Sequence, residues 1–202
     1  MYVTEIEAVN SKKSRVYLDQ EFVFILYRRE IAAYRIRKGS EISEEQYKKI
    51  LEETILHRAK LRCMNLLKTM DRTEAQLRQK LKQGEYPDEI IERAIEYVKG
   101  YRYVDDERYA RQYVQCFCEK KSKYQIIQEL MRKGIRKEMV EQAFADIPEI
   151  NEIEQIQKWM EKRNFDPENA DRKEQQRFYG FLMRRGFSAE NIRKALRNTE
   201  NI

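Results

Sequence analysis

The sequence predicts a mainly α-helical chain, with elongated tandem three-helix repeats in three units and a small N-terminal antiparallel β-sheet. An apolar pattern recurs three times along the chain, which is typical of a repeat architecture. Only 6 Gly and 3 Pro interrupt the 202 residues. Charged residues make up 38% of the chain, against about a quarter in ordinary domains, which favours thin helical units with much solvated surface.

The N-terminal segment has the pattern of strands. Tyr2–Val9 alternates between apolar and polar residues, and Asn10–Ser14 is a polar turn. Arg15–Leu18 and Glu21–Tyr27 are rich in β-branched and aromatic residues and are separated by Asp19–Gln20. This pattern predicts two or three antiparallel strands. Such a sheet is marginally stable alone, so we expect it to pack on another part of the chain.

Two helices are predicted next. A short helical piece covers residues 28–37 and ends at Gly39. Ser43, followed three residues later by Gln46, has the form of a capping box, and a long helix is predicted from there to about Met70.

Further helix starts are marked by the same signals. Thr73 is followed by Gln76 at capping-box spacing, and Asn151 and Asp171 are each followed three residues later by Glu.

The strongest organisational signal is an internal repeat. Residues 81–95, 130–144 and 182–196 align without a gap. The apolar and small residues that coincide are Leu81, Leu130 and Leu182, then Tyr86, Ile135 and Phe187, then Ile91, Val140 and Ile192, then Ala94, Ala143 and Ala195, then Ile95, Phe144 and Leu196. Each copy has a Gly at the end of its first helix, at Gly84, Gly134 or Gly186, and this position slips by one in the first copy.

Each copy is therefore predicted to be a helix, a Gly-containing turn with one apolar plug, and a second helix. In the second helix of the first copy, Ile91, Ala94 and Ile95 face inward, and the Ala permits close helix approach. A further helix precedes each pair, at about 57–70, 105–119 and 151–162. Since one such unit has little core, neighbours are expected to stack into an elongated body. The predicted domains are a sheet extension at 1–42 and helical repeats at 43–100, 101–148 and 149–202.

Three segments carry a resemblance to a known family. These are LLKTMDRTEAQLRQKL at 66–81, YRYVDDERYARQYV at 101–114 and IIQELMRKGI at 126–135. Together and in this order they resemble the RecX family, with Thr73 where Ser is common and Gln76 in place of Glu. The resemblance covers about Leu61 to the C-terminus, and the N-terminal sheet looks like the extension that longer members carry.

The resemblance implies a regulatory function. RecX proteins bind the RecA filament on DNA along its helical groove and inhibit strand exchange and ATP hydrolysis. We therefore expect the partner to be a RecA recombinase filament, and the chain to be a monomer. A direct DNA-binding helical repeat protein, which would bind single- or double-stranded DNA through the same cations, is the alternative.

Positive charge is concentrated in two stretches. The net formal charge is +6, but 172–197 contains eight basic and two acidic residues, and 111–138 contains eight basic and three acidic residues. Arg132–Lys133 and Arg184–Arg185 occupy the same place in two repeats, at a helix end where a solvated cation is equally expected. The candidate partner-binding residues are Arg72, Arg78, Lys82, Arg108, Arg111, Lys120, Lys121, Lys123, Arg132, Lys133, Arg184 and Arg185.

Aromatic residues near these cations have two interpretations. Tyr101, Tyr103, Tyr109 and Tyr113 could stack on bases, but burial in the core is the commoner role. Trp159 is predicted to anchor the first helix of the third repeat.

The sequence contains no pattern for catalysis. Asp105 and Asp106 could be paired catalytic carboxylates, but their place before an apolar-periodic helix favours helix capping. The chain has one His, at position 57, and no Gly-rich phosphate loop. Cys116 and Cys118 point about 200° apart on a helix, so no zinc set forms locally. We expect no enzyme activity, no cofactor and no metal.

The location of the protein is predicted from its cysteines and apolar runs. The odd number of Cys, 3, indicates reduced thiols and a cytoplasmic protein. We expect no signal peptide, and no apolar run approaches the roughly 20 residues of a membrane span.

Overall fold

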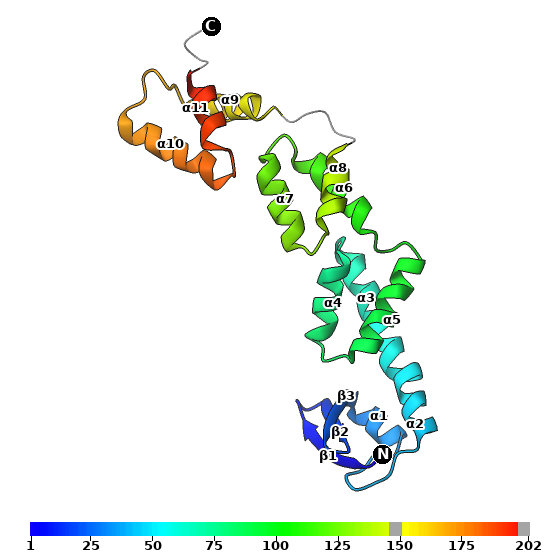
Figure 1. Cartoon of the computed structure of the whole chain (residues 1–202). Helices are drawn as coiled ribbons and strands as arrows, with labels where there is room; N and C mark the ends of the chain where they lie inside the picture. Colours follow the sequence, from blue (N-terminus) through cyan, green and yellow to red (C-terminus); the bar gives the residue numbers. More distant parts are fainter. Residues whose placement is uncertain (146–150, 198–202) are drawn as a thin grey trace. The chain divides into compact units, whose positions relative to one another are not determined.

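The computed structural model describes residues 1–145 and 151–197, which form a mainly helical chain with a small sheet at its N-terminus (Figure 1). The chain divides into two compact units, Met1–Asp105 and Asp106–Ile202. Unit 1 contains the sheet and the first repeat, and unit 2 contains the second and third repeats.

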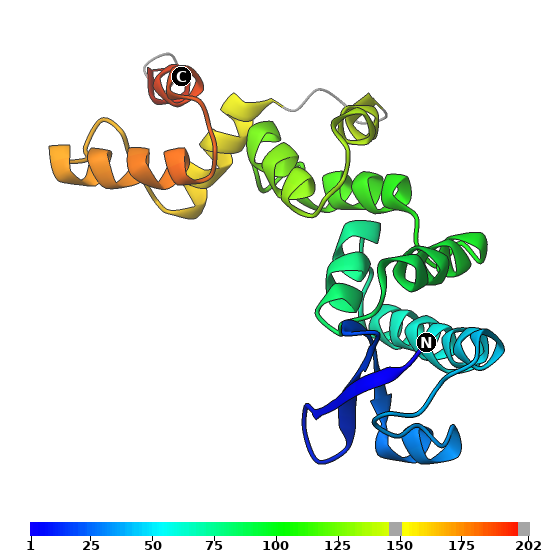
Figure 2. The ribbon, with the colours of Figure 1, turned by 60° about the horizontal axis from the view of Figure 1, so that its bottom comes forward.

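The predicted sheet is present. Strands β1 (Val3–Ala8), β2 (Lys13–Leu18) and β3 (Glu21–Tyr27) pair antiparallel in the order β1-β2-β3 (Figure 2). The β2–β3 turn is made by Asp19 and Gln20, whose φ values are 48° and 74°. Positive φ at both turn residues is typical of a two-residue hairpin turn that matches the twist of the strands.

The helices that follow differ in detail from those predicted. Helix α1 (Arg28–Ala33) ends four residues before the predicted end. The predicted long helix is present as α2 (Glu44–Lys49), a π-helical segment η1 (Ile50–Leu56) and α3 (His57–Thr69).

Ser43 caps α2 as predicted, since its side chain accepts a hydrogen bond from the Gln46 backbone N–H. The capping box is not closed, because the Gln46 side chain instead donates to the Tyr34 carbonyl at 2.7 Å. This bond fixes the start of α2 to the end of α1.

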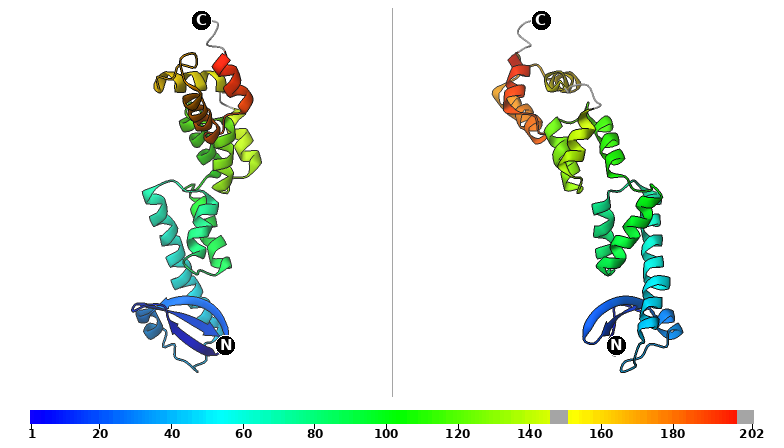
Figure 3. Two further views of the ribbon diagram at one scale, coloured as in Figure 1. Left: turned by 90° about the vertical axis from the view of Figure 1, so that its left-hand side faces the viewer. Right: turned by 45° about the vertical axis from the view of Figure 1, so that its right-hand side comes forward.

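The sheet and the first repeat share one hydrophobic core. Phe24 of β3 and Tyr47 of α2 stack with ring centroids 6.1 Å apart, and both belong to the cluster that includes Leu77 and Leu81. The two views of Figure 3 show the strands beside the start of the helix that runs from Glu44 to Thr69. The sheet therefore packs on the helical repeat, as its marginal stability requires.

Charged contacts also join the sheet to the repeat. Arg15 of β2 binds the Glu85 carboxylate through Nε at 2.6 Å and Nη2 at 2.9 Å. Arg58 of α3 pairs with Glu30 at 3.1 Å and donates to the Ile25 carbonyl of β3 at 2.5 Å.

Each repeat has the predicted three helices. The first consists of α3, α4 (Glu74–Lys82) and α5 (Asp88–Gly100), and the second of α6 (Asp106–Phe117), α7 (Lys123–Arg132) and α8 (Lys137–Ala145). The third consists of α9 (Glu152–Lys162), α10 (Arg172–Arg184) and α11 (Ala189–Arg197). The predicted caps at Thr73, Asn151 and Asp171 all accept the expected backbone hydrogen bond.

The repeated apolar positions are buried in corresponding places. Leu81, Leu130 and Leu182 are fully buried, each in the hydrophobic cluster of its own repeat. The plugs Ile135 and Phe187 are buried, and Tyr86 is half-buried. The three Ala of the pattern, Ala94, Ala143 and Ala195, are buried as well.

The turn between the second and third helices explains the slip in the glycine position. Gly134 and Gly186 have φ of 84° and 79°, and in the first repeat it is Glu85, not Gly84, that has a positive φ, of 56°. Glu85 aligns with the two glycines, so the turn geometry is the same in all three copies. At Gly186 a side chain would also collide, because a Cβ there would lie 2.7 Å from the Ser122 Oγ.

This turn provides a stability test. Gly186→Ala should destabilise unit 2 by more than about 1 kcal/mol, because alanine is strained at positive φ and its Cβ meets the Ser122 hydroxyl. Urea unfolding followed by Trp159 fluorescence measures this loss. Gly180→Ala, in the same unit, is the control, since a Cβ there meets only the end of the Arg184 side chain at 3.4 Å, an ordinary contact, and alanine in a helix interior should be neutral or stabilise by about 0.5–1 kcal/mol. Equal effects of the two substitutions would contradict the account of the turn.

Candidate partner-binding surface

The junction between the second and third repeats brings two predicted basic stretches together. Ser122, the N-cap of α7, accepts from the Gln125 backbone N–H at 3.1 Å and donates its hydroxyl to the Arg185 carbonyl at 2.9 Å. The Lys120–Lys123 run and the Arg184–Arg185 pair therefore lie side by side in unit 2.

Further hydrogen bonds hold this junction. The Gln155 side chain of α9 donates to the Cys118 carbonyl at the end of α6. Glu152 accepts from the Lys123 backbone N–H at 3.2 Å and from the Asn191 side chain at 2.8 Å. These bonds fix the two repeats relative to each other within unit 2.

Two of the predicted cations meet over one ring of the second repeat. Lys121 and Lys133 each place Nζ 5.5 Å from the centroid of Tyr113. Lys121 also lies 4.1 Å from the Phe117 centroid and pairs with Glu129 at 2.5 Å. Its charge is therefore neutralised inside the repeat, and Lys121 is part of the fold.

The cluster of Lys121, Tyr113 and Glu129 shifts two pKa values. Burial raises the pKa of Glu129, but the hydrogen bonds from Lys121 and Tyr113 outweigh it and hold that pKa below the ordinary 4.5. Burial, together with the hydrogen bond to Glu129, raises the pKa of Tyr113 well above its ordinary value.

The third repeat holds arginines around an aromatic group. Arg185 places its Cζ 3.7 Å from the Phe181 centroid and 4.6 Å from the Trp159 ring. Arg163, which follows α9, places its Cζ 3.7 Å from the same Phe181 centroid. Burial, and then the charges of Arg163 and Arg184, lower the pKa of Arg185. Trp159 packs on the core of this repeat, as predicted, and meets Phe181 edge to face with the ring centroids 5.3 Å apart.

In unit 1 two of the three predicted cations, Arg78 and Lys82, form ion pairs within the fold. Arg78 pairs with Glu92 at 2.8 Å and with Glu74 at 3.1 Å, and Lys82 pairs with Asp88 at 3.3 Å. The half-buried Arg72 has its Nε buried without a hydrogen-bond partner.

The remaining predicted cations lie in unit 2. Lys123 places its Nζ 5.3 Å from the Phe144 ring, and the exposed Arg132 donates to the Gln128 carbonyl at 3.4 Å. Arg108 and Lys120 are exposed, and Arg111 is half-buried.

The tyrosines divide between surface and core. Tyr101 and Tyr103 are 62% and 47% exposed, with ring centroids 5.9 Å apart, so the expectation of burial is wrong for them. Tyr109 and Tyr113 are half-buried and pack on the core of the second repeat.

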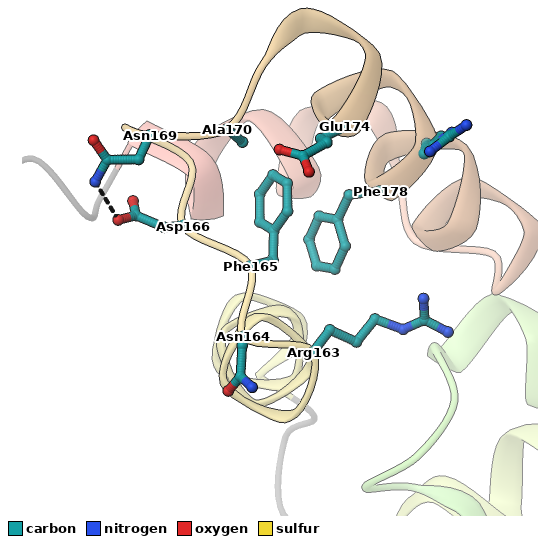
Figure 4. Close-up of a pocket in the computed structure, with 9 residues that line it drawn as sticks. Arg163, Asn164, Phe165, Asp166, Asn169, Ala170, Glu174 and Phe178 are labelled. Atoms are coloured by element: carbon teal, nitrogen blue, oxygen red, sulfur yellow. Dashed lines mark hydrogen bonds between the residues drawn. The ribbon is translucent and has the colours of Figure 1, made fainter.

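A surface pocket of about 360 Å³ lies in the third repeat (Figure 4). The rings of Phe165 and Phe178 stack in this pocket, with their centroids 4.1 Å apart. The acidic side chains that line the pocket stabilise the local backbone. Asp166 accepts from the Glu168 backbone N–H and the Asn169 side chain, and Glu174 closes the capping box of α10. These carboxylates therefore have structural partners.

Across residues 1–145 and 151–197, no three His, Cys, Asp or Glu side chains are grouped so that they could hold a metal ion. Cys63 is buried, and burial raises the pKa of its thiol to about 11. Asp106 is the first residue of α6, which agrees with a place at a helix start.

Of the helices described, none combines the length and the apolar character needed to span a bilayer.

The fold and this surface define a tandem three-helix repeat protein with a basic junction between two of its repeats. Models of the first, second and third three-helix domains of RecX match residues 59–97, 105–143 and 151–196.

Known proteins are similar to this chain over nearly its full length. A regulatory protein RecX from Caldanaerobacter subterraneus is 34% identical over 98% of this chain and 100% of its own. One from Clostridium acetobutylicum is 31% identical over 96% of this chain and 94% of its own. A crystal structure of regulatory protein RecX has a TM-score of 0.60 and 26% identity, covering 96% of this chain and 98% of that one. The chain belongs to the RecX family of regulatory proteins.

Two arginines at structurally important places were not among the predicted residues. Arg58 joins the sheet to the first repeat, and Arg163 shares the Phe181 ring with Arg185. Arg163 lies outside the repeated pattern, so alignment of the copies gives no signal for it. The only indication in the sequence that Arg163 is important is its position at the end of a helix, shortly after Trp159.

The Glu129 cluster gives a pH-dependent prediction. Glu129→Gln should lower the stability of unit 2 by about 2 kcal/mol at pH 7, because Lys121 loses a charged hydrogen-bond partner. Since the folded state holds the pKa of Glu129 below 4.5, this stability is present above that pH and is lost as pH falls through the lowered pKa.

Urea unfolding of both proteins at a series of pH values measures the difference. Glu141→Gln is the control, because its pair with Lys137 is exposed and its loss should cost less than about 0.5 kcal/mol. A difference that persisted unchanged into acid would contradict the assignment to Glu129.

Proposed function

We propose that this chain binds the RecA–DNA filament and restrains its recombinase and ATPase activities. Membership of a family of regulatory proteins supports a regulatory role. The observation that carries the proposal is the junction in unit 2, where Ser122 brings its neighbours Lys120 and Lys123 beside Arg184 and Arg185. A surface of this charge is attracted to a polyanion such as a DNA-bound filament.

The proposal assigns no chemical step to the chain itself. Its carboxylates near the third-repeat pocket hold the backbone, and the charged groups of the first repeat pair with one another. We infer a non-enzymatic regulator that acts as a monomer in the cytoplasm, where it would meet its recombinase.

Direct DNA binding is the second candidate, and the same cations favour it. Phosphate contacts would then give most of the affinity, and the logarithm of the binding constant would fall with the logarithm of salt by about 0.9 for each duplex phosphate neutralised. The two functions are separated by comparing bare single-stranded DNA with the RecA–DNA filament at matched salt. A marked preference for the filament supports the first, and equal affinity supports the second.

The regulatory activity can be measured directly. Stoichiometric protein should lower the DNA-dependent ATPase and the strand exchange of the recombinase, because a protein bound along the filament obstructs both. If both activities remain at their values without the protein, the proposal fails.

The cations at the repeat ends can be tested as a group. Neutralising Arg132, Lys133, Arg184 and Arg185 to Gln should weaken filament binding with little loss of helicity by circular dichroism. The matched control neutralises four exposed lysines that pair with a glutamate one turn away: Lys48, Lys137, Lys158 and Lys194. Binding that drops equally in both variants would show that only total charge matters, and would remove the four candidates from the site.

A further inference from the structure

Two guanidinium groups share one aromatic ring in the third repeat. Arg163 and Arg185 each have Cζ 3.7 Å from the Phe181 centroid. The two Cζ atoms are therefore no farther apart than twice that distance. Cation–π contacts of this kind hold guanidinium groups in place.

No acidic partner for these positive charges is found in residues 1–145 and 151–197. Among the residues that the structure describes, none of the three arginines Arg163, Arg184 and Arg185 takes part in an ion pair. Like charges at such separations repel, most strongly where burial reduces screening. The lowered pKa of Arg185 has this cause, after burial. An anion bound here would relieve that repulsion.

The Arg185 side chain is also fixed in place before any ligand binds. The Arg185 carbonyl is bound by the Ser122 hydroxyl, and its guanidinium contacts both Phe181 and Trp159. In Figure 4 the Arg163 side chain extends past Phe178 and away from Asp166 and Asn169. Side chains already fixed in place lose less conformational entropy when a ligand binds.

We propose that Arg163, Arg184 and Arg185 form a binding site for phosphodiester groups of DNA. The inference rests on the proposed function and deepens it, by assigning the third repeat to the DNA of the filament. The planar guanidinium fork matches phosphate oxygens and can donate two parallel hydrogen bonds. A DNA strand supplies one negative charge at every nucleotide, which suits three neighbouring cations better than the single carboxylate of an acidic side chain.

The single Trp of the chain reports on this site. Because Arg185 lies 4.6 Å from the Trp159 ring, a phosphate that binds Arg185 should change the tryptophan emission. Oligo(dT) and an abasic oligonucleotide of equal length should both produce the change, since only phosphates are required. No emission change with the abasic strand would overturn the proposal.

Salt dependence tests Arg184 alone and the Arg163–Arg185 pair together. Arg184→Gln removes a charge without touching the ring contacts, and should reduce the salt slope for single-stranded DNA by about 0.7. Arg163→Gln with Arg185→Gln should reduce it by about twice as much. Arg172→Gln is the control, because it removes the same charge from the other end of α10, about 18 Å away, and should leave the slope unchanged.

Three results would contradict the site. These are an unchanged slope for Arg184→Gln, an equal reduction by Arg172→Gln, and a poly-glutamate peptide of matched charge that binds as tightly as the abasic strand. The last would identify an acidic protein segment as the ligand. All arms use bare DNA, so their failure is distinct from a failure of wild-type protein to lower the recombinase ATPase, which would instead remove the proposed function.

Discussion

Burial of a small apolar set in each three-helix repeat is the constraint on which the rest of the structure depends. Leu81, Leu130 and Leu182 lie in the last turn of the middle helix of their repeats and are fully buried. A left-handed residue then turns the chain, so that the plug residue can cover the same core. With so small a core per repeat, most charged residues must remain at the surface, and their pairing decides what that surface can bind.

The two units differ in the contacts that their positively charged side chains make. In unit 1 many cations pair within the fold, as Arg15 does with Glu85 and Arg78 with Glu92. In unit 2 the arginines beside the Ser122 junction contact aromatic rings instead, so that their charge is positioned but not neutralised. Positioned charge is what a polyanionic partner requires, and its location is a stronger indication of function than the net charge of the chain.

Local sequence patterns predicted the helices, but they could not predict contacts between residues far apart in the sequence. Capping at Thr73 and Asp171 and burial of the repeated leucines depend on residues a few positions apart, which periodicity captures. The bond from Ser122 to Arg185 joins residues 63 positions apart, and no sequence pattern indicates it. Arg78 was a candidate for a partner because its sequence neighbours do not show that Glu92 would reach it.

The most direct test of the central claim is a structure of the protein bound to a RecA–DNA filament. The account predicts that the junction of the second and third repeats, with Arg184 and Arg185, faces the filament. A complex in which these arginines point into solvent, while the sheet or the paired cations of the first repeat make the contact, would contradict it.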